Sequence, residues 1–337
     1  MAAFSMALAL LGGVIGAGFA SGREILRFFG VHGAMAPAAV VAACLSLFAF
    51  FLRVSGKMRA CGAASLTQLC RHQFGCRFGL FCGALFVLLC AVTGAAMLAA
   101  CAELGALLLP VRHGYGLSLM FTLLLSAFLS LRALSGLALP GALLMLLTPY
   151  LLARLMMLPA GEACFLPAMT PDLPVRALCD GAAYGALSAA QLAGMLTLLA
   201  GQDRRTRLRA ALLFSLLLGG LLVLGTAVCQ RHMPAIVHQA LPFVYLSRAL
   251  GPPGYLLVAL CMYAAALSTY LAMLRALLPA KPNIRSVLLA SLVCLLLSQA
   301  GFDFIIAHGY PLLGALCAGL LLVLCMPVCP RADATAL

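Results

Sequence analysis

Ten stretches of mostly apolar residues constrain the fold of this chain more than any other feature of its sequence. Each is close to the length of about 20 residues that a helix needs to cross the hydrocarbon core of a bilayer. They lie at 4–29, 34–52, 77–104, 115–131, 136–158, 180–200, 208–229, 253–278, 285–301 and 304–327. Backbone polar groups in lipid must be paired within a helix or a closed barrel, and the sequence lacks the alternating pattern of barrel strands. We therefore predict ten transmembrane helices.

The composition agrees with an all-α integral membrane protein. Of the 337 residues, 65% are hydrophobic and 9% are charged, and the mean hydropathy is +1.15. Soluble domains contain about 45–50% apolar and about 25% charged residues, so a water-soluble globule is excluded. The lipid bilayer is thus a partner of the chain. The net charge of +13 does not point to nucleic acid, because the basic residues are spread over the connections between apolar stretches.

The lysines and arginines predict the orientation in the membrane. With the N-terminus in the cytoplasm, 14 of the 21 lie on the cytoplasmic side, where membrane proteins carry an excess of these residues. We predict a multi-pass protein of the plasma (inner) membrane with both termini cytoplasmic. It would contain five helices in 1–158, an extracellular connection at 159–179, five helices in 180–327 and a cytoplasmic tail at 328–337.

Two long connections of similar length predict an internal repeat. Residues 53–76 and 230–252 lie five spans apart and on opposite sides of the membrane, and each holds a partly apolar stretch, Leu66 to Phe74 and Ile236 to Leu250, typical of a short interfacial helix. A repeat of five plus five helices with inverted topology would produce this pairing. A chance agreement in loop length is the alternative.

The first apolar stretch is too rich in glycine for an ordinary helix. Residues 12–22 contain five glycines, and each weakens a helix by about 1 kcal/mol relative to alanine. We predict an unwound stretch whose amides, from Ala17, Gly18, Phe19, Ala20, Ser21 and Gly22, bind an anionic group such as a carboxylate. The alternative is that the glycines only allow close packing of helices.

The sequence GVIGAGFASGREILRFFG at residues 13–30 resembles the opening signature of the YkvI-like bacterial membrane proteins. These belong to the amino acid–polyamine–organocation superfamily, which has the LeuT-type fold. The resemblance implies a secondary transporter that works by alternating access, with helices 1 and 6 broken around a central substrate site.

The eighth stretch holds a candidate sodium site. Ala265, Ser268 and Thr269 share one helix face, so one carbonyl and two hydroxyls could point to one ion. This pattern is similar to half of the sodium site of sodium-coupled superfamily members, and the resemblance implies that Gly12 and Ile15 supply the other half. The alternative is that both hydroxyls bond to carbonyls of their own helix.

Sodium is the expected coupling ion, and no other cofactor is predicted. Proton-coupled relatives carry a lysine in span five, whereas the lysines here are Lys57 and Lys281, both in connections. Coupling to protons through a residue such as Glu103 or His308 remains the alternative.

The sixth stretch, as the repeat partner of the first, should also contribute to the substrate site. A break near 185–189 would place Tyr184, Ser188 and Gln191 close to the substrate, and Thr93 of the third stretch would face them. The sequence shows no acidic residue at mid-membrane depth, which favours a small zwitterionic or anionic organic solute such as an amino acid over a cation.

An outer gate is implied by the resemblance. Relatives of this plan pair an arginine of span one with an acid of span ten, and Arg27 and Asp303 match those positions. The alternative is that both side chains only reach the membrane surface. A catalytic constellation such as paired acids within a span is not found, so we do not expect an enzyme. A membrane receptor or assembly protein without transport activity is the remaining alternative.

Overall fold

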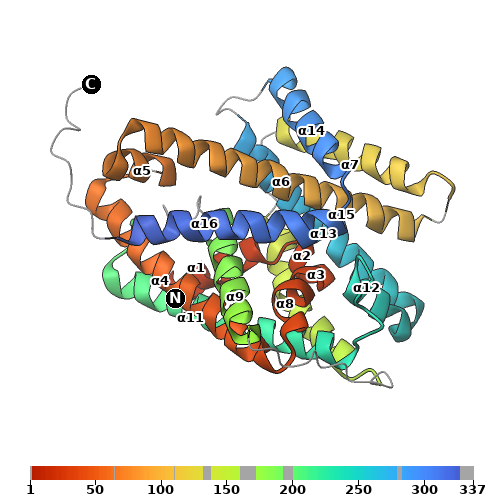
Figure 1. Cartoon of the computed structure of the whole chain (residues 1–337). Helices are drawn as coiled ribbons and strands as arrows, with labels where there is room; N and C mark the ends of the chain where they lie inside the picture. The colour runs from red at the N-terminus through yellow and green to blue at the C-terminus, as the bar shows by residue number, and fades with distance from the viewer. Residues whose placement is uncertain are drawn as a thin grey trace.

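The computed structural model describes residues 2–63, 65–109, 111–131, 138–159, 172–192, 200–278 and 283–326, and these residues form helices joined by short connections (Figure 1). In chain order the elements are α1 (Ala2–Val14), α2 (Ala17–Ser21), α3 (Arg23–Phe28), η1 (Gly30–Met35), α4 (Ala36–Cys61), α5 (Leu66–Phe74), α6 (Cys76–Leu108), α7 (Gly114–Leu131), α8 (Ala138–Met156), α9 (Leu173–Gln191), α11 (Arg204–Arg231), α12 (Pro242–Ser247), η4 (Arg248–Leu250), α13 (Gly251–Leu277), α14 (Ile284–Ser298), α15 (Phe302–Phe304), η5 (Ile305–Gly309) and α16 (Tyr310–Cys325). The segment η5 is a π-helix that joins α15 to α16 without a break.

Five helical segments in the described part of the chain are long and apolar enough to cross a membrane. They are Gly30–Cys61, Cys76–Leu108, Arg204–Arg231, Pro242–Leu277 and Phe302–Cys325. These segments make the chain a multi-pass membrane protein. The number is five rather than the predicted ten because several predicted stretches form shorter helices: α1, α7 and α14 are apolar but short, and residues 193–199 of the sixth stretch lie outside the described residues. The predicted tail at 328–337 also lies outside them.

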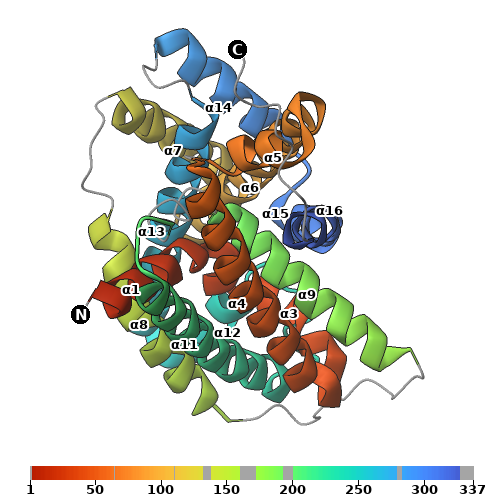
Figure 2. The same cartoon turned by 90° about the vertical axis from the view of Figure 1, so that its left-hand side faces the viewer.

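The helices pack in two groups with the first segment between them. Helices α6, α7, α13 and α14 all contact one another and form the first group (Figures 1 and 2). In the second group, α4 contacts both α9 and α11, α1 lies against α11, and α16 lies against α9. The short helix α2 contacts α13 and α6 of the first group, whereas α3 contacts α9 and α11 of the second. The start of the chain therefore links both groups.

Local sequence signals explain where several helices begin. The Asp203 carboxylate accepts hydrogen bonds from the amides of Arg205 and Thr206 and so begins α11. Hydrogen bonds from Thr206, first from its side chain and then from its amide, lower the pKa of Asp203. Asn283 and Ser286 form a reciprocal capping box that begins α14. The helices expected within the two long connections are confirmed, one as α5 and the other as α12 with η4.

The break expected near 185–189 is wrong, because α9 runs without interruption from Leu173 to Gln191. Its glycines serve close packing instead. A Cβ atom at Gly181 would collide with the carbonyl oxygen of Ala39, and one at Gly185 with the side chain of Ser46, both on α4. Glycine here allows two helix backbones to approach each other, as small residues do in membrane helix pairs.

Replacement of Gly181 by alanine is therefore expected to destabilise the protein. The added methyl group must push α9 away from Ala39, and overpacking of this kind costs about 1–3 kcal/mol. Gly220→Ala is a matched control, because no atom lies within 4 Å of a Cβ at that helical glycine. Thermal unfolding of the purified variants should show a lower midpoint for Gly181→Ala alone, and equal midpoints would contradict the packing role.

Candidate functional site

The first segment is interrupted twice, as its glycine content predicts. Helix α1 ends at Val14, and Gly16 is extended with φ −95° and ψ −172°. Helix α2 then ends at Gly22, whose φ of +80° is a left-handed conformation that glycine adopts at low cost. A Cβ at Gly22 would also lie 2.7 Å from the Phe243 ring. The predicted interruption of helical hydrogen bonding within this segment is confirmed.

Some polar groups of the interrupted segment form hydrogen bonds with one another. The Ser21 hydroxyl donates to the carbonyl of Gly18 at 2.9 Å and accepts from the amide of Arg23 at 3.1 Å. The amide of Ala20 donates to the carbonyl of Gly16 at 2.9 Å. Phe19 is buried, and Ala20 is half-buried. Binding of a substrate carboxylate by residues 17–22 stays a prediction.

The expected sodium ligands come from α1 with the turn that follows it and from α13, and α13 contacts the neighbouring helix α2. Thr269 lies against the interruption, since a Cβ at Gly16 would be 2.9 Å from the Thr269 hydroxyl oxygen. The Ser268 hydroxyl instead donates to the carbonyl of Ala265 on its own helix at 2.9 Å, which is the local alternative. Gly12 lies in the last turns of α1, and Ile15 directly follows that helix. The structure thus brings Thr269 to the interruption, and the sodium site stays a prediction.

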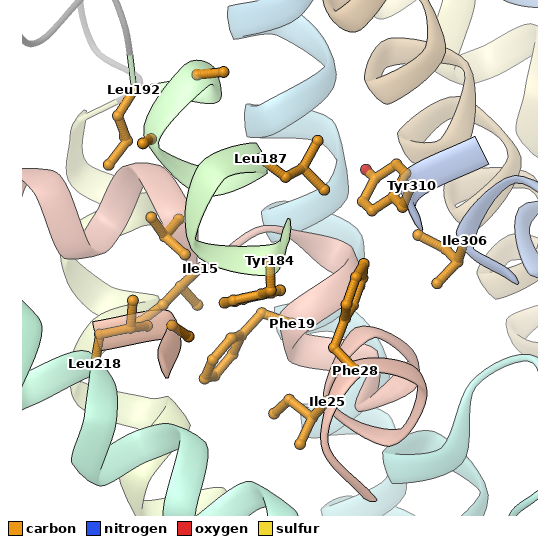
Figure 3. Packing of buried hydrophobic residues seen from close by; sticks show 14 of the residues in the cluster. Ile15, Phe19, Ile25, Phe28, Tyr184, Leu187, Leu192, Leu218, Ile306 and Tyr310 are labelled. Carbon is orange, nitrogen blue, oxygen red and sulfur yellow. The ribbon is translucent and has the colours of Figure 1, made fainter. Parts of the chain in front are cut away.

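The residues expected to face the substrate do lie close together. The Gln191 side-chain amide donates to the Thr93 hydroxyl at 3.4 Å, which joins α9 to α6. Tyr184 and Ser188 are buried one turn apart on α9. The Tyr184 ring packs against Phe28 and Phe29, with ring centroids 5.5 and 5.0 Å apart, and Figure 3 shows it deep among apolar side chains.

Two tyrosine hydroxyls in this region are buried without a hydrogen bond of good geometry. Tyr184 of α9 and Tyr310 at the start of α16 are both about 1% exposed or less, and no well-formed hydrogen bond reaches either hydroxyl in the described part of the structure, although Ser188 and Thr93 lie beside them. Figure 3 shows both rings in the same buried layer as Phe28. A buried hydroxyl without a partner costs free energy, so each one needs an explanation. The sequence did not single out Tyr310.

Glu24 is the residue at this site that sequence reasoning missed. Its position between Arg23 and Arg27 suggests the outer surface, yet the residue is only 8% exposed. Its carboxyl group fills the space above Gly18, where a Cβ would collide with it. The side chains of Tyr184 and Tyr310 lie in its vicinity. The burial of Glu24 was not expected, because burial depends on packing and not on local sequence, and the expectation of no acidic residue at mid-membrane depth stays a prediction.

The ion pairs of α3 differ from the expected outer gate. Asp303 pairs with Arg23, whose guanidinium also donates to the carbonyl of Val237 at 2.8 Å. Arg27 pairs with Asp180 of α9 at 3.3 Å. The two arginines are four residues apart and share one face of α3, so a shift of one turn decides which of them reaches α15. The expected pair of Arg27 with Asp303 is replaced by these two pairs.

Charge reversal should show whether Asp303 pairs with Arg23 or with Arg27. Asp303→Lys brings two positive groups together and should destabilise the protein, whereas adding Arg23→Glu should restore the attraction. We expect a coupling of about 0.5–3 kcal/mol from a double-mutant cycle in thermal unfolding. The matched combination of Asp303→Lys with Arg27→Glu should show no such recovery, and recovery there instead would favour the pair expected from the sequence.

A scan against models of protein families and a search of curated proteins both found no match. The resemblance of residues 13–30 to the YkvI-like proteins stays a prediction.

Proposed function

We propose that this chain is a secondary active transporter that moves a small organic solute by alternating access. One observation carries the proposal: the first segment is interrupted at Gly16 and Gly22, and its pieces contact both helix groups beside buried polar side chains. Discontinuous helices at membrane depth are typical of substrate and ion sites in transporters. A segment that contacts both groups is placed to respond when one group moves against the other.

Contacts between helices support the proposed ten spans and their inverted repeat. Helical segments lie in each of the ten predicted stretches. Four pairs of segments five positions apart in this order contact each other directly: α1 with α9, α4 with α11, α6 with α13, and α7 with α14. A repeat related by a two-fold axis in the membrane plane would place corresponding segments side by side in this way.

Hydrogen bonds between helix ends support the proposed topology. The Lys57 ammonium at the end of α4 donates to carbonyls at the end of α16, and Arg59 donates to the carbonyl of Gln202 before α11. All three ends are cytoplasmic in the proposed orientation. The Gln230 amide at the far end of α11 donates to the carbonyl of Gly33, and both lie on the proposed outer side. We propose the inner membrane as the location.

The solute we propose is a small zwitterion or anion such as an amino acid. A recess of about 480 Å³ lined by Arg27, Arg176 and Asp180 lies on the proposed outer side and would admit it. An unpaired carboxylate at Glu24 would repel the carboxylate of such a solute. If the carboxylate of the solute binds beside Glu24, a neutral Glu24 favours its binding.

Sodium is the coupling ion that we propose, held by Gly12, Ile15, Ala265, Ser268 and Thr269. The contact of Thr269 with Gly16 supports it. Coupling to protons is the second candidate, and the buried carboxyl group of Glu24 favours it.

Thermal stability of the purified protein should identify the solute. We would screen amino acids and organic acids, each in sodium and in potassium buffer, and test every stabilising compound for uptake into proteoliposomes. A ligand that binds the folded state raises its stability by mass action. Accumulation of a stabilising solute against its gradient would support the transporter. Binding without any uptake would contradict it and favour a receptor.

A further inference from the structure

Three buried oxygen-bearing side chains come from the region where the interrupted segment contacts α9 and η5, the turn that leads into α16. Glu24 comes from α3, Tyr184 from α9 and Tyr310 from the start of α16. No hydrogen bond of good geometry reaches either tyrosine hydroxyl among the described residues, although Ser188 lies beside Tyr184 and Thr93 beside Tyr310.

The basic side chains near Glu24 are engaged elsewhere. Arg23 pairs with Asp303, and Arg27 pairs with Asp180. His32 of η1 also contacts the Asp180 carboxylate, at 3.1 Å. The titratable or charged groups on α3 and on the elements that contact it are Arg23, Arg27, His32, Arg176, Cys179, Asp180, Tyr184, Arg204, Arg205, Arg207, Arg209, Cys229, Arg231 and His308, and Asp303 and Tyr310 flank η5. Within the described residues, Glu24 has no ion pair with any of them.

A buried carboxylate without a counter-charge is unstable, so this one must be neutralised. A proton needs no coordination shell. A metal cation needs several oxygen ligands around it, whereas the carboxyl group of Glu24 is packed directly on Gly18. The packing therefore favours a bound proton over a bound metal ion.

We propose that Glu24 is a proton-binding residue of the transport pathway, neutral in this closed arrangement and able to release its proton when α3 moves away from Gly18. This proposal rests on the transporter function proposed above. On release, the O–H bond of the acid breaks and the proton passes to water that enters as α3 moves. A hydroxyl of Tyr184 or Tyr310 that turns toward the carboxylate can then donate a hydrogen bond to it.

Infrared difference spectroscopy on the purified full-length protein tests the proposal without any substrate. As the pH is raised stepwise, the carbonyl band of a protonated carboxylic acid should disappear. We expect Glu24→Gln to lack this band and Glu103→Gln, the matched change in α6, to keep it. Tyr310→Phe should keep the band but shift its frequency, because the environment of the acid loses a hydroxyl. A band that persists in Glu24→Gln would overturn the proposal.

Isotope labelling keeps the test decisive if Glu24→Gln does not fold. The chain has three glutamates, Glu24, Glu103 and Glu162, and carbon-13 labelling of glutamate in the Glu103→Gln variant, which removes the other buried glutamate of the described residues, must shift the band. A band that does not shift belongs to an aspartate, which would also overturn the proposal. The spectroscopic result is separate from transport: a band lost in Glu24→Gln without uptake of any solute would contradict the transporter function, and uptake without such a band would contradict the proton site.

Discussion

A methyl group added at residue 18 should destabilise the protein, and the loss should depend on Glu24. In Gly18→Ala the new Cβ atom occupies the space of the Glu24 carboxyl group, so this group must move within a packed, buried region. Overpacking of a protein interior costs about 1–3 kcal/mol, although alanine itself favours a helix by about 1 kcal/mol over glycine. Unfolding free energies of the purified protein measure the net effect.

A double-mutant cycle with Glu24→Ala identifies the cause. Removing the carboxyl group leaves room for the methyl group, so Gly18→Ala should cost little in that background. Contacting residues typically show coupling of about 0.5–3 kcal/mol. Gly220→Ala, where the surrounding space is open, should show no coupling with Glu24→Ala. A Gly18→Ala effect that is the same in both backgrounds would mean that the carboxyl group does not lie above Gly18.

Thr269→Ala should remove most of the sodium dependence of uptake. If the threonine hydroxyl binds sodium together with carbonyls at the interruption, its loss should weaken sodium binding by about tenfold, which corresponds to about 1.4 kcal/mol. Sodium and solute raise the affinity for each other by the same factor, so solute binding should lose its response to sodium as well. Uptake into proteoliposomes with an imposed sodium gradient measures the effect.

Ser268→Ala is the matched control for this experiment. The Ser268 hydroxyl already bonds to the carbonyl of Ala265, so its loss should reduce sodium dependence less than the loss of the Thr269 hydroxyl. Equal effects would mean that both hydroxyls bind the ion in another conformation. Uptake that ignores sodium and follows a pH gradient would contradict sodium coupling and favour coupling through Glu24.

The helix interruption and the short helix in the first long connection were predictable from the sequence, since both depend on residues that are close together in the chain. The density of glycine around Gly16 predicts the interruption because each glycine weakens the helix locally. The short helix at Leu66–Phe74 was expected with the same limits that the structure gives it. The glycines of α9 show the boundary of this reasoning: Gly181 and Gly185 suit either a break or a close helix contact, and only the position of α4 decides between them.

Pairing and burial of charged side chains were not predictable in this way. Arg23 and Arg27 share a helix face, so the sequence does not determine which of them reaches Asp303. Glu24 lies on another side of the same short helix, where α2 and α9 cover it. Its neighbours in sequence are charged, but its neighbours in space are glycine and aromatic rings. The partner of Asp303 and the burial of Glu24 both depend on contacts between elements that are far apart in the chain.

The π-helical turn between Asp303 and Tyr310 has a mechanical consequence. A π-turn accommodates one more residue than an α-turn, and five residues, Ile305–Gly309, adopt it here. Conversion of this turn to α-helix would shift the register by one residue, which rotates one end of the helix by about 100° relative to the other. Such a conversion would rotate Asp303, the acid that pairs with Arg23, relative to Tyr310. Tyr310 could stay in the core, and α16 would not have to bend.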